Sequence, residues 1–356
     1  MRDGKRLRTS SKLFLACLLI GLGIACQSGA SDSRPDEASG TDEALETPSP
    51  RFRGGSGDDD LGPARVAVNP VTNRIYVTNE RGGSVSVING DTNAIVARIP
   101  VGSFPFGVAV NVETNRVYVA NTVSGTVSVI DGESNTVVAT VAAEDSPKGV
   151  GVNPLTNRIY VTNFASESVS IIDGTTDSVI GSIDVQTAPI AVDIDPEGNR
   201  IYVTNMSSNT VSFIDASTNE IVGTATVGVG FVDPFSLGLD DARDRAYTPN
   251  FQTNEVSVID TASATIISAV KVGTEPRDVA VHPGTGHIYV ANTGSNDVSI
   301  IDGATSRVSG TVQVGANPLG VAVNAESNRI YVANFGDDTV TVIDAATDTL
   351  IATIGS

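Results

Sequence analysis

A six-residue segment of the form Arg-Ile-Tyr-Val-Thr-Asn recurs through the chain at an almost constant interval. Its copies contain all seven tyrosines of the chain, which are Tyr76, Tyr118, Tyr160, Tyr202, Tyr247, Tyr289 and Tyr331. Their spacings are 42, 42, 42, 45, 42 and 42 residues. A proline recurs at the same intervals, at Pro63, Pro105, Pro147, Pro189, Pro234, Pro276 and Pro318. A fixed period of this length indicates a repeat architecture in which each repeat is one supersecondary unit.

Each repeat contains four short segments with the composition and alternation of β-strands. In the second repeat these are residues 107–111, 116–121, 126–131 and 136–141, called strands A, B, C and D below. The A–B and C–D connections are polar turns that suit antiparallel hairpins. A single four-stranded meander leaves its faces uncovered, whereas seven packed around an axis cover one another. The sequence therefore predicts an all-β, seven-bladed β-propeller over residues 63–356, with strand A innermost. Because each repeat begins at A and ends at D, we expect the ring to close without a strand exchanged between the first and last blades.

The Tyr-Val-Thr-Asn and Tyr-Val-Ala-Asn tetrads within these copies resemble the YVTN repeats of YncE-like and surface-layer β-propellers. The resemblance covers residues 63–356 and implies an exported, mostly non-enzymatic binding or structural protein. The fifth repeat departs most from the pattern, because Pro249 stands inside its strand B. Proline lacks the amide hydrogen that a ladder needs, so we expect that strand to be bulged or locally unpaired.

The N-terminal part has the features of an export signal followed by a tether. A basic stretch and an apolar stretch over residues 1–25 are typical of a secretion signal and are too short for a comfortable membrane span. The residues before Cys26 resemble a bacterial lipobox, although Gly23 stands where that family usually has leucine. We therefore predict a lipidated Cys26 and a cell-envelope location, with an ordinary cleaved signal as the alternative. Residues 26–62 are rich in Ser, Gly, Pro and acidic residues and are predicted to be a disordered tether.

The charge of the chain argues against nucleic acid as a partner. The formal charge is −19 overall and +4 over residues 1–25, so residues 26–356 carry −23. Such a body repels phosphate backbones, and non-specific binding to them needs clustered Lys and Arg. Both cysteines, Cys17 and Cys26, lie near the N-terminus, so we expect neither disulfide nor thiol chemistry in the propeller. We expect no cofactor, a monomeric state, and membrane contact only through the lipid.

Residues that recur in every repeat are interpreted as scaffold. These are the tyrosines, the asparagines that end strand B and the prolines before strand A. In five repeats an arginine of strand B precedes an aspartate of strand C by 15 residues, as Arg116 precedes Asp131. If strands B and C pair antiparallel, these side chains meet across the hairpin, where an exposed ion pair contributes about 0–1 kcal/mol. In the sixth repeat His287 and Asp302 take these places, and we expect them to pair.

Metal sites find little support in the sequence. His282 and His287 are the only histidines and flank one A–B turn. Two ligands on one surface hairpin are a weak basis for a metal site, so both are interpreted as surface substitutions for the Asn and Arg of other repeats. The acidic turns at 91–93 and 337–338 lack an EF-hand pattern and are interpreted as turn residues rather than calcium ligands.

Residues that occur in only one or two repeats are candidates for function. In a meander the B–C and D–A connections leave the same end of the ring, which we call the top. Seven of the nine phenylalanines beyond the signal map to this end, and so does the one three-residue insertion, between Gly228 and Pro234. Exposed aromatic residues rimmed by charge are typical of recognition surfaces. The candidate binding face consists of Phe104, Phe106, Lys148, Phe231, Asp233, Phe235, Glu275 and Arg277.

Three functions compete. The first is an exported, lipid-anchored propeller that binds an envelope or extracellular protein, peptide or glycan with its top face. The second is a structural envelope or surface-layer module whose phenylalanines only plug the channel and cover the blades. The third is an enzyme similar to propeller lactonases or lyases, for which fold alone is no argument. Acid–base chemistry at the channel mouth would fall to Lys148, Asp233, Glu275 and Arg277, and no catalytic constellation is evident among them.

Overall fold

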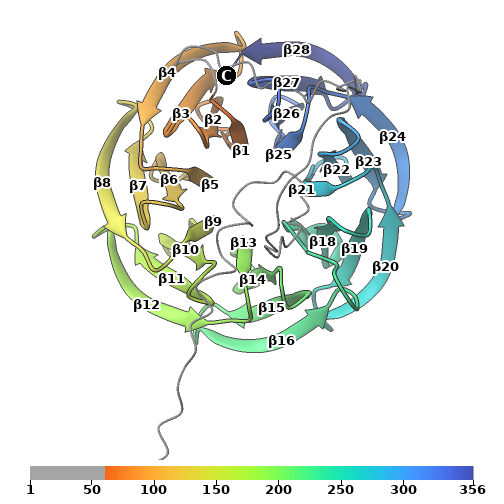
Figure 1. Ribbon diagram of the computed structural model, residues 1–356, viewed down its shortest axis with the longest axis horizontal. Coiled ribbons are helices and arrows are strands. Elements are labelled where there is room, and N and C mark those ends of the chain that lie inside the picture. Colours follow the sequence, from red (N-terminus) through yellow and green to blue (C-terminus); the bar gives the residue numbers. More distant parts are fainter. Residues whose placement is uncertain (1–60, 356) are drawn as a thin grey trace, which may run out of the picture. The chain divides into compact units, whose positions relative to one another are not determined.

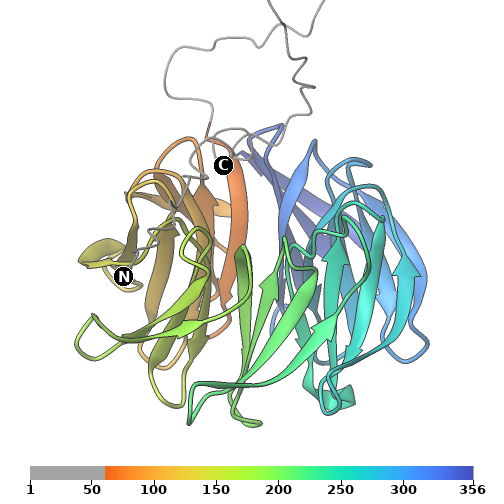
Figure 2. The same ribbon diagram turned by 60° about the horizontal axis from the view of Figure 1, so that its bottom comes forward.

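The computed structural model describes residues 61–355, which form a seven-bladed β-propeller around a central channel (Figure 1). Every blade is a four-stranded antiparallel sheet whose strands follow the chain order from the channel outwards. In the side view the strands run between the two ends of the ring, where the connections lie (Figure 2). The predicted all-β, seven-bladed fold is confirmed. No helix among residues 61–355 has the length and apolar character to span a membrane.

Each blade takes its strands from one sequence repeat. Blade 1 contains β1 (Pro63–Asn69), β2 (Arg74–Asn79), β3 (Ser84–Asn89) and β4 (Ala94–Pro100). Blade 2 contains β5 (Pro105–Asn111), β6 (Arg116–Asn121), β7 (Thr126–Asp131) and β8 (Thr136–Ala142). Blade 3 contains β9 (Pro147–Asn153), β10 (Arg158–Asn163), β11 (Ser168–Asp173) and β12 (Ser178–Asp184). Blade 4 contains β13 (Pro189–Asp195), β14 (Arg200–Asn205), β15 (Thr210–Asp215) and β16 (Glu220–Thr226).

The same order holds in the second half of the ring. Blade 5 contains β17 (Gly238–Asp240), β18 (Arg245–Asn250), β19 (Glu255–Asp260) and β20 (Thr265–Lys271), with the short 3-10 helix η1 (Asp241–Arg243) between β17 and β18. Blade 6 contains β21 (Pro276–Val281), β22 (His287–Asn292), β23 (Asp297–Asp302) and β24 (Arg307–Gln313). Blade 7 contains β25 (Pro318–Asn324), β26 (Arg329–Asn334), β27 (Thr339–Asp344) and β28 (Thr349–Gly355).

The ring closes without an exchanged strand, as expected from the coincidence of repeat and blade. Strands β1–β4 form one sheet and β25–β28 form another. Residues of β2 and β3 share a buried apolar cluster with residues of β26, β27 and β28. At Gly320 the two inner strands approach so closely that a Cβ would lie 2.5 Å from the carbonyl oxygen of Ala64. We expect residues 51–62 to add no strand to blade 7. Leu61 and Gly62, the two of these residues that the structure describes, belong to no strand. The other ten lie outside the described residues.

The recurring tyrosines pack each blade against the next one. Tyr160 of blade 3, for example, shares a cluster with Ile194 and Ile201 of blade 4. The recurring asparagines also hold the scaffold. The side-chain amide of Asn79 donates to the hydroxyls of Ser84 and Ser86 in the neighbouring strand C, at 3.0 and 2.9 Å. Equivalent bonds recur in every blade, so this amide ties strand B to strand C.

The arginines of strand B are not mainly partners of the aspartates in their own hairpin. Arg116 and Asp131 are register partners as expected, but the Arg116 guanidinium reaches Asp177 in the next blade at 2.7 Å. Asp131 instead caps its own turn, and hydrogen bonds from Ser134 hold the pKa of its carboxyl below the ordinary value. Only in blade 4 do the side chains approach each other, with Arg200 and Asp215 at 4.0 Å. Most of these described arginines therefore link blades rather than fix a hairpin.

Pro249 interrupts pairing on one side of its strand only. Strand β18 pairs with β19 in continuous register through Pro249 and Val256, whereas its pairing with β17 ends at Tyr247. The Pro249 carbonyl accepts a hydrogen bond from the backbone of Phe235, on the channel side. Because the two backbone groups of a strand residue face the same neighbour, the missing amide hydrogen also faces that side. Inner strand β17 is accordingly only three residues long.

Candidate functional site

The residues before the strand-A prolines share one backbone conformation that sets the rim of the top. All seven have a positive φ, and they are Gly62, Phe104, Ser146, Ala188, Asp233, Glu275 and Asn317. Each of their carbonyls accepts a hydrogen bond from the residue that follows the strand-B asparagine, as Phe104 does from Thr122 at 2.9 Å. A left-handed conformation is costly for phenylalanine and is held here by the surrounding bonds. The predicted residues Phe104, Asp233 and Glu275 therefore occupy one equivalent rim position in three blades.

Three cations from different blades gather with phenyl rings at the channel mouth. The Arg65 guanidinium lies 4.9 Å from the ring centroid of Phe106 and 5.7 Å from that of Phe235. Lys148 contacts the same Phe106 ring, with its Nζ 4.5 Å from the centroid. Arg277 lies 4.8 Å from Phe235. The mouth thus carries positive charge on an aromatic floor, in a propeller whose residues 63–356 contain 14 Lys and Arg against 31 Asp and Glu.

Lys148 and Arg277 have no ion-pair partner among residues 61–355. Burial lowers the pKa of the Lys148 ammonium, and the Glu80 carboxylate only partly opposes that effect. Burial, followed by repulsion from Arg65, lowers the pKa of Arg277 to about 10. The Arg277 Nε atom is buried without a hydrogen-bond partner in the described part of the chain. These two cations are therefore partly desolvated and incompletely compensated, which is unfavourable for a charge in a folded protein.

Glu80 is a mouth residue that the sequence analysis missed. Burial raises the pKa of its carboxyl, while Lys148, Arg277, Arg65 and Arg81, in that order, lower it. The single Glu80 carboxylate is therefore the shared negative neighbour of several cations. A comparison of the repeats identifies Glu80 as an exception, because the position after the strand-B asparagine carries Thr, Phe or Met in the other six blades.

The predicted aromatic face divides into two groups. Phe106 belongs to a buried cluster with Ala188, Ile190 and Met206, and Phe235 packs against that cluster. Phe231, on the insertion, is 89% exposed, and Phe104 is 39% exposed. The inner rings plug part of the channel mouth, whereas the outer ones are available for contact.

The predicted charged residues do not converge on one cavity. The Asp233 carboxylate accepts a hydrogen bond from Gln252 at 3.1 Å. Glu275 is exposed on the rim, and its charge acts on Arg277. The residues that line the channel cavity include none of Lys148, Asp233, Glu275 and Arg277.

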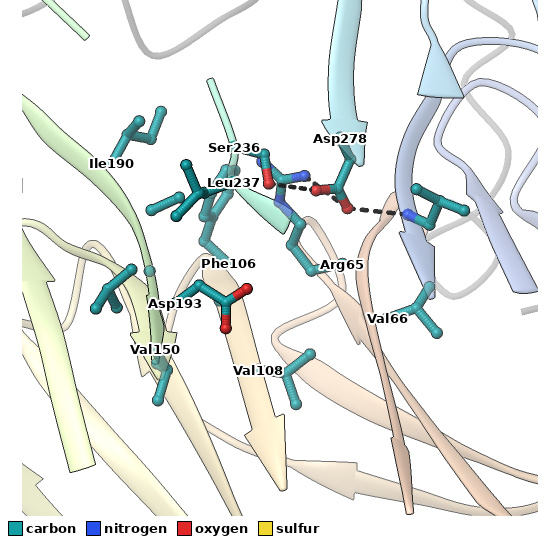
Figure 3. Close-up of a pocket in the computed structure, with 15 residues that line it drawn as sticks. Arg65, Val66, Phe106, Val108, Val150, Ile190, Asp193, Ser236, Leu237 and Asp278 are labelled. Carbon is teal, nitrogen blue, oxygen red and sulfur yellow. Dashed lines mark hydrogen bonds and ion pairs between the residues drawn. The ribbon is translucent and has the colours of Figure 1, made fainter. Parts of the chain in front are cut away.

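That cavity occupies the channel and has a volume of about 240 Å³ (Figure 3). On one wall Arg65 of blade 1 and Asp278 of blade 6 form an ion pair at 3.0 Å. Ser236 donates its hydroxyl to Asp278 Oδ1 at 2.5 Å, and the Val321 backbone donates to Oδ2 at 2.9 Å. Arg65 also donates to the Leu319 carbonyl at 2.9 Å. Both charged groups of this wall are thus paired and hydrogen-bonded.

Asp193 lines the same cavity but has no ion-pair partner among the described residues (Figure 3). Its Oδ1 accepts a hydrogen bond from the backbone of Ile194 at 2.9 Å. Burial raises the pKa of the Asp193 carboxyl to about 7, and repulsion by Asp241 and Asp278 adds to this effect. Asp193 was not among the residues predicted from the sequence. The fourth residue after the proline is Ala or Gly in every other blade: Ala67, Ala109, Gly151, Gly238, Ala280 and Ala322.

His282 has a scaffold role, so its interpretation as a surface substitution is wrong. His282 is 4% exposed. Its Nδ1 accepts hydrogen bonds from the backbones of Gly284 and Thr285, and its Nε2 lies 2.9 Å from Asn328 Oδ1 in the next blade. Asn69 makes the same set of contacts in blade 1, so His282 replaces an interblade asparagine.

His287 and Asp302 are register partners but form no ion pair. The Asp302 carboxylate instead accepts hydrogen bonds from the backbones of Ala304 and Thr305. The bond from Thr305 is the main reason why the pKa of Asp302 is lowered, and the charge of His287 contributes least. The expected pair is therefore replaced by a turn cap, as in the other blades.

Comparisons with known proteins agree with this architecture. No curated protein matches the sequence. A chain of hydrazine synthase from Kuenenia stuttgartiensis is similar in structure, with a TM-score of 0.73 and 20% identity, over 84% of this chain and 100% of that one. At this identity the likeness shows a shared fold alone. The model of the YncE-like β-propeller family matches residues 152–349, which is more than half of the chain. The tetrads, the seven single-repeat blades and this match together place the chain in the YncE-like β-propeller family.

Proposed function

We propose that this protein is an exported, lipid-anchored binding module whose channel mouth recognises a carboxylate-bearing peptide. The observation that carries the proposal is the incomplete compensation of Lys148 and Arg277 at the mouth. Every other position directly after a strand-A proline is apolar: Ala64, Phe106, Ile190, Phe235 and Leu319. A blade therefore does not need a cation there, and these two residues are explained by a ligand better than by the scaffold.

A bound carboxylate would relieve the cost of burying these cations. A guanidinium binds a carboxylate through two parallel hydrogen bonds, and the buried Nε–H of Arg277 has no partner in the described part of the chain. The Arg277 guanidinium carbon lies 4.8 and 4.7 Å from the centroids of the Phe235 and Phe251 rings, which hold the cation at the mouth. The overall negative charge of the propeller repels acidic partners elsewhere, so attraction is confined to the mouth.

The exposed rim favours a peptide over a bare anion. Phe231 and Phe104 present apolar rings to solvent, and aromatic side chains together with Arg supply much of the energy in protein recognition. Phe231 lies on the only length irregularity of the repeats, and insertions in repeat proteins often form the binding face.

Export and anchoring rest on the sequence. The basic and apolar stretches of residues 1–25 and the position of Cys26 support them, and both lie outside the described residues. We propose that residues 26–62 act as the tether between the lipid and the propeller.

Fluorescence anisotropy with rhodamine-labelled peptide pools tests the proposal. One pool carries Asp and Glu between aromatic residues, and a second carries Asn and Gln at the same positions. We expect saturable binding of the acidic pool only, weakened at least about tenfold by Lys148→Ala or Arg277→Ala and unchanged by Arg307→Ala, an exposed cation of β24. Equal binding of both pools, or equal loss in all three variants, would refute carboxylate recognition. Absence of binding to either pool would favour the structural module.

A further inference from the structure

The channel cavity contains one charged group that the scaffold leaves uncompensated. Arg65 and Asp278 neutralise each other at 3.0 Å, and the two oxygens of Asp278 are also occupied by Ser236 and Val321. Asp193 has no cation beside it among residues 61–355, and its known partners are backbone N–H groups. When Asp193 is ionised, the cavity thus holds a net negative charge that a ligand can balance.

We propose that this cavity is a second binding site, separate from the mouth, for a small organic ammonium ion held by Asp193. The other six blades have Ala or Gly at the position of Asp193, so blade structure does not require a carboxylate there. A ligand explains this single carboxylate better. An unpaired carboxylate in a narrow channel is costly, and an ammonium group is the simplest partner that removes this cost.

The size and walls of the cavity define the rest of the ligand. A volume of about 240 Å³ equals the share of about eight water molecules in the liquid, at ~30 Å³ each. Aliphatic side chains, Val66, Val108, Val150, Ile190 and Leu237 among them, line the cavity together with the polar groups named above and with polar backbone atoms. A primary amine with a short branched alkyl chain satisfies both features. Metal ions lack the apolar part that these walls would cover.

The charges around Asp193 make the site depend on pH. The charged neighbours that act on it are Asp241 of η1 and Asp278 of β21, and both repel a second negative charge. Burial and this repulsion keep Asp193 half protonated near neutrality. A cation that binds beside it must lower its pKa, so binding releases a proton at pH 7 and weakens as the pH falls below about 7.

Isothermal titration calorimetry with isopentylamine as the probe tests the site, with isopentanol as its neutral counterpart. At pH 8 we expect the amine to bind with a Kd of about 1 mM or tighter and the alcohol to bind at least about tenfold more weakly. At pH 5 the amine should lose at least about tenfold in affinity. Titration at pH 7 in two buffers of different ionisation enthalpy should show proton release.

Variants separate this site from a general effect on the fold. Asp193→Ala, the residue of other blades, and Asp193→Asn should abolish amine binding, while Asp184→Asn, at the exposed end of β12, should leave it unchanged. A thermal midpoint at or above that of the wild type shows that the Asp193 variants fold. Amine binding that survives in a folded Asp193→Ala protein, or equal affinity for amine and alcohol, would overturn the proposal. Absence of binding at pH 8 would overturn it as well. None of these outcomes depends on peptide binding at the mouth.

Discussion

Replacement of Asp193 by asparagine should make the protein less sensitive to rising pH. The folded-state pKa of this carboxyl is about 7, above the ordinary 3.8. A carboxyl whose pKa is raised on folding stabilises the folded state through its proton. This contribution to the free energy of unfolding is complete below the unfolded-state pKa and is lost as the pH rises through the folded-state pKa. The wild type should therefore lose stability between about pH 4 and pH 7 on account of Asp193, and Asp193→Asn should not.

The magnitude follows from the size of the shift. A change of about three units, at 1.36 kcal/mol per unit, corresponds to about 4 kcal/mol. Asp193 is only half-buried because it faces the cavity, and water there reduces the cost of its charge. We therefore expect about 2–4 kcal/mol, with the unfolding free energy of Asp193→Asn rising by this amount relative to the wild type between pH 4 and pH 8.

Urea denaturation followed by circular dichroism, at half-unit steps from pH 4 to pH 8, measures this difference. The turn-capping aspartates, whose pKa values are lowered by backbone hydrogen bonds, cancel because both proteins contain them. Asp184→Asn, at the exposed end of β12, serves as the control for removal of a negative charge. A wild-type minus Asp193→Asn difference that stays constant over this range would show that Asp193 is solvated or paired, and would refute the reasoning.

Three further outcomes are expected. His282→Asn should leave the thermal midpoint nearly unchanged because asparagine makes the same interblade bonds elsewhere. His282→Ala should lower the free energy of unfolding by about 1–3 kcal/mol because it leaves Asn328 and turn N–H groups unpaired. Equal effects of the two variants in thermal melts would contradict this role. Phe231→Ala should weaken peptide binding by roughly 1–4 kcal/mol without changing stability, whereas Phe235→Ala should lower the thermal midpoint because its ring packs on the channel cluster; the reverse result would identify Phe231 as structural. Intact-mass spectrometry of membrane-extracted protein should find an acylated N-terminal Cys26, and a soluble, unacylated product would exclude the anchor.

The fold was predictable because the repeats report it seven times. Any single strand of four to seven residues is ambiguous, but the tyrosine and proline steps define where each blade begins and ends. Buried tyrosines between blades explain why this residue cannot vary. The topology of a meander also placed the B–C and D–A connections at one end, which brought the mouth cations into the candidate face.

Contacts between blades were not predictable from pairing within a hairpin. Arg116 lies in the expected register with Asp131, yet its long side chain reaches Asp177 of the next blade, because the Asp131 carboxylate is already used by its turn. Phe235 and Phe231 were predicted as one group because both lie in the same connection. Position in a connection does not determine whether a ring packs into the channel, as Phe235 does, or faces solvent, as Phe231 does. Asp193 was not predicted because it lies within inner strand β13 rather than in a connection at the top, although a comparison of the inner strands across the seven repeats isolates it.

The central claim is that residues outside the repeat pattern at the channel mouth bind a carboxylate. The most direct test is the anisotropy titration of the acidic peptide pool with the Lys148→Ala/Arg277→Ala double variant at two salt concentrations. The wild type should bind saturably and more weakly at high salt, since ions screen charge attraction, while the double variant should not bind and should keep its thermal midpoint. Undiminished binding by a folded double variant would contradict the account.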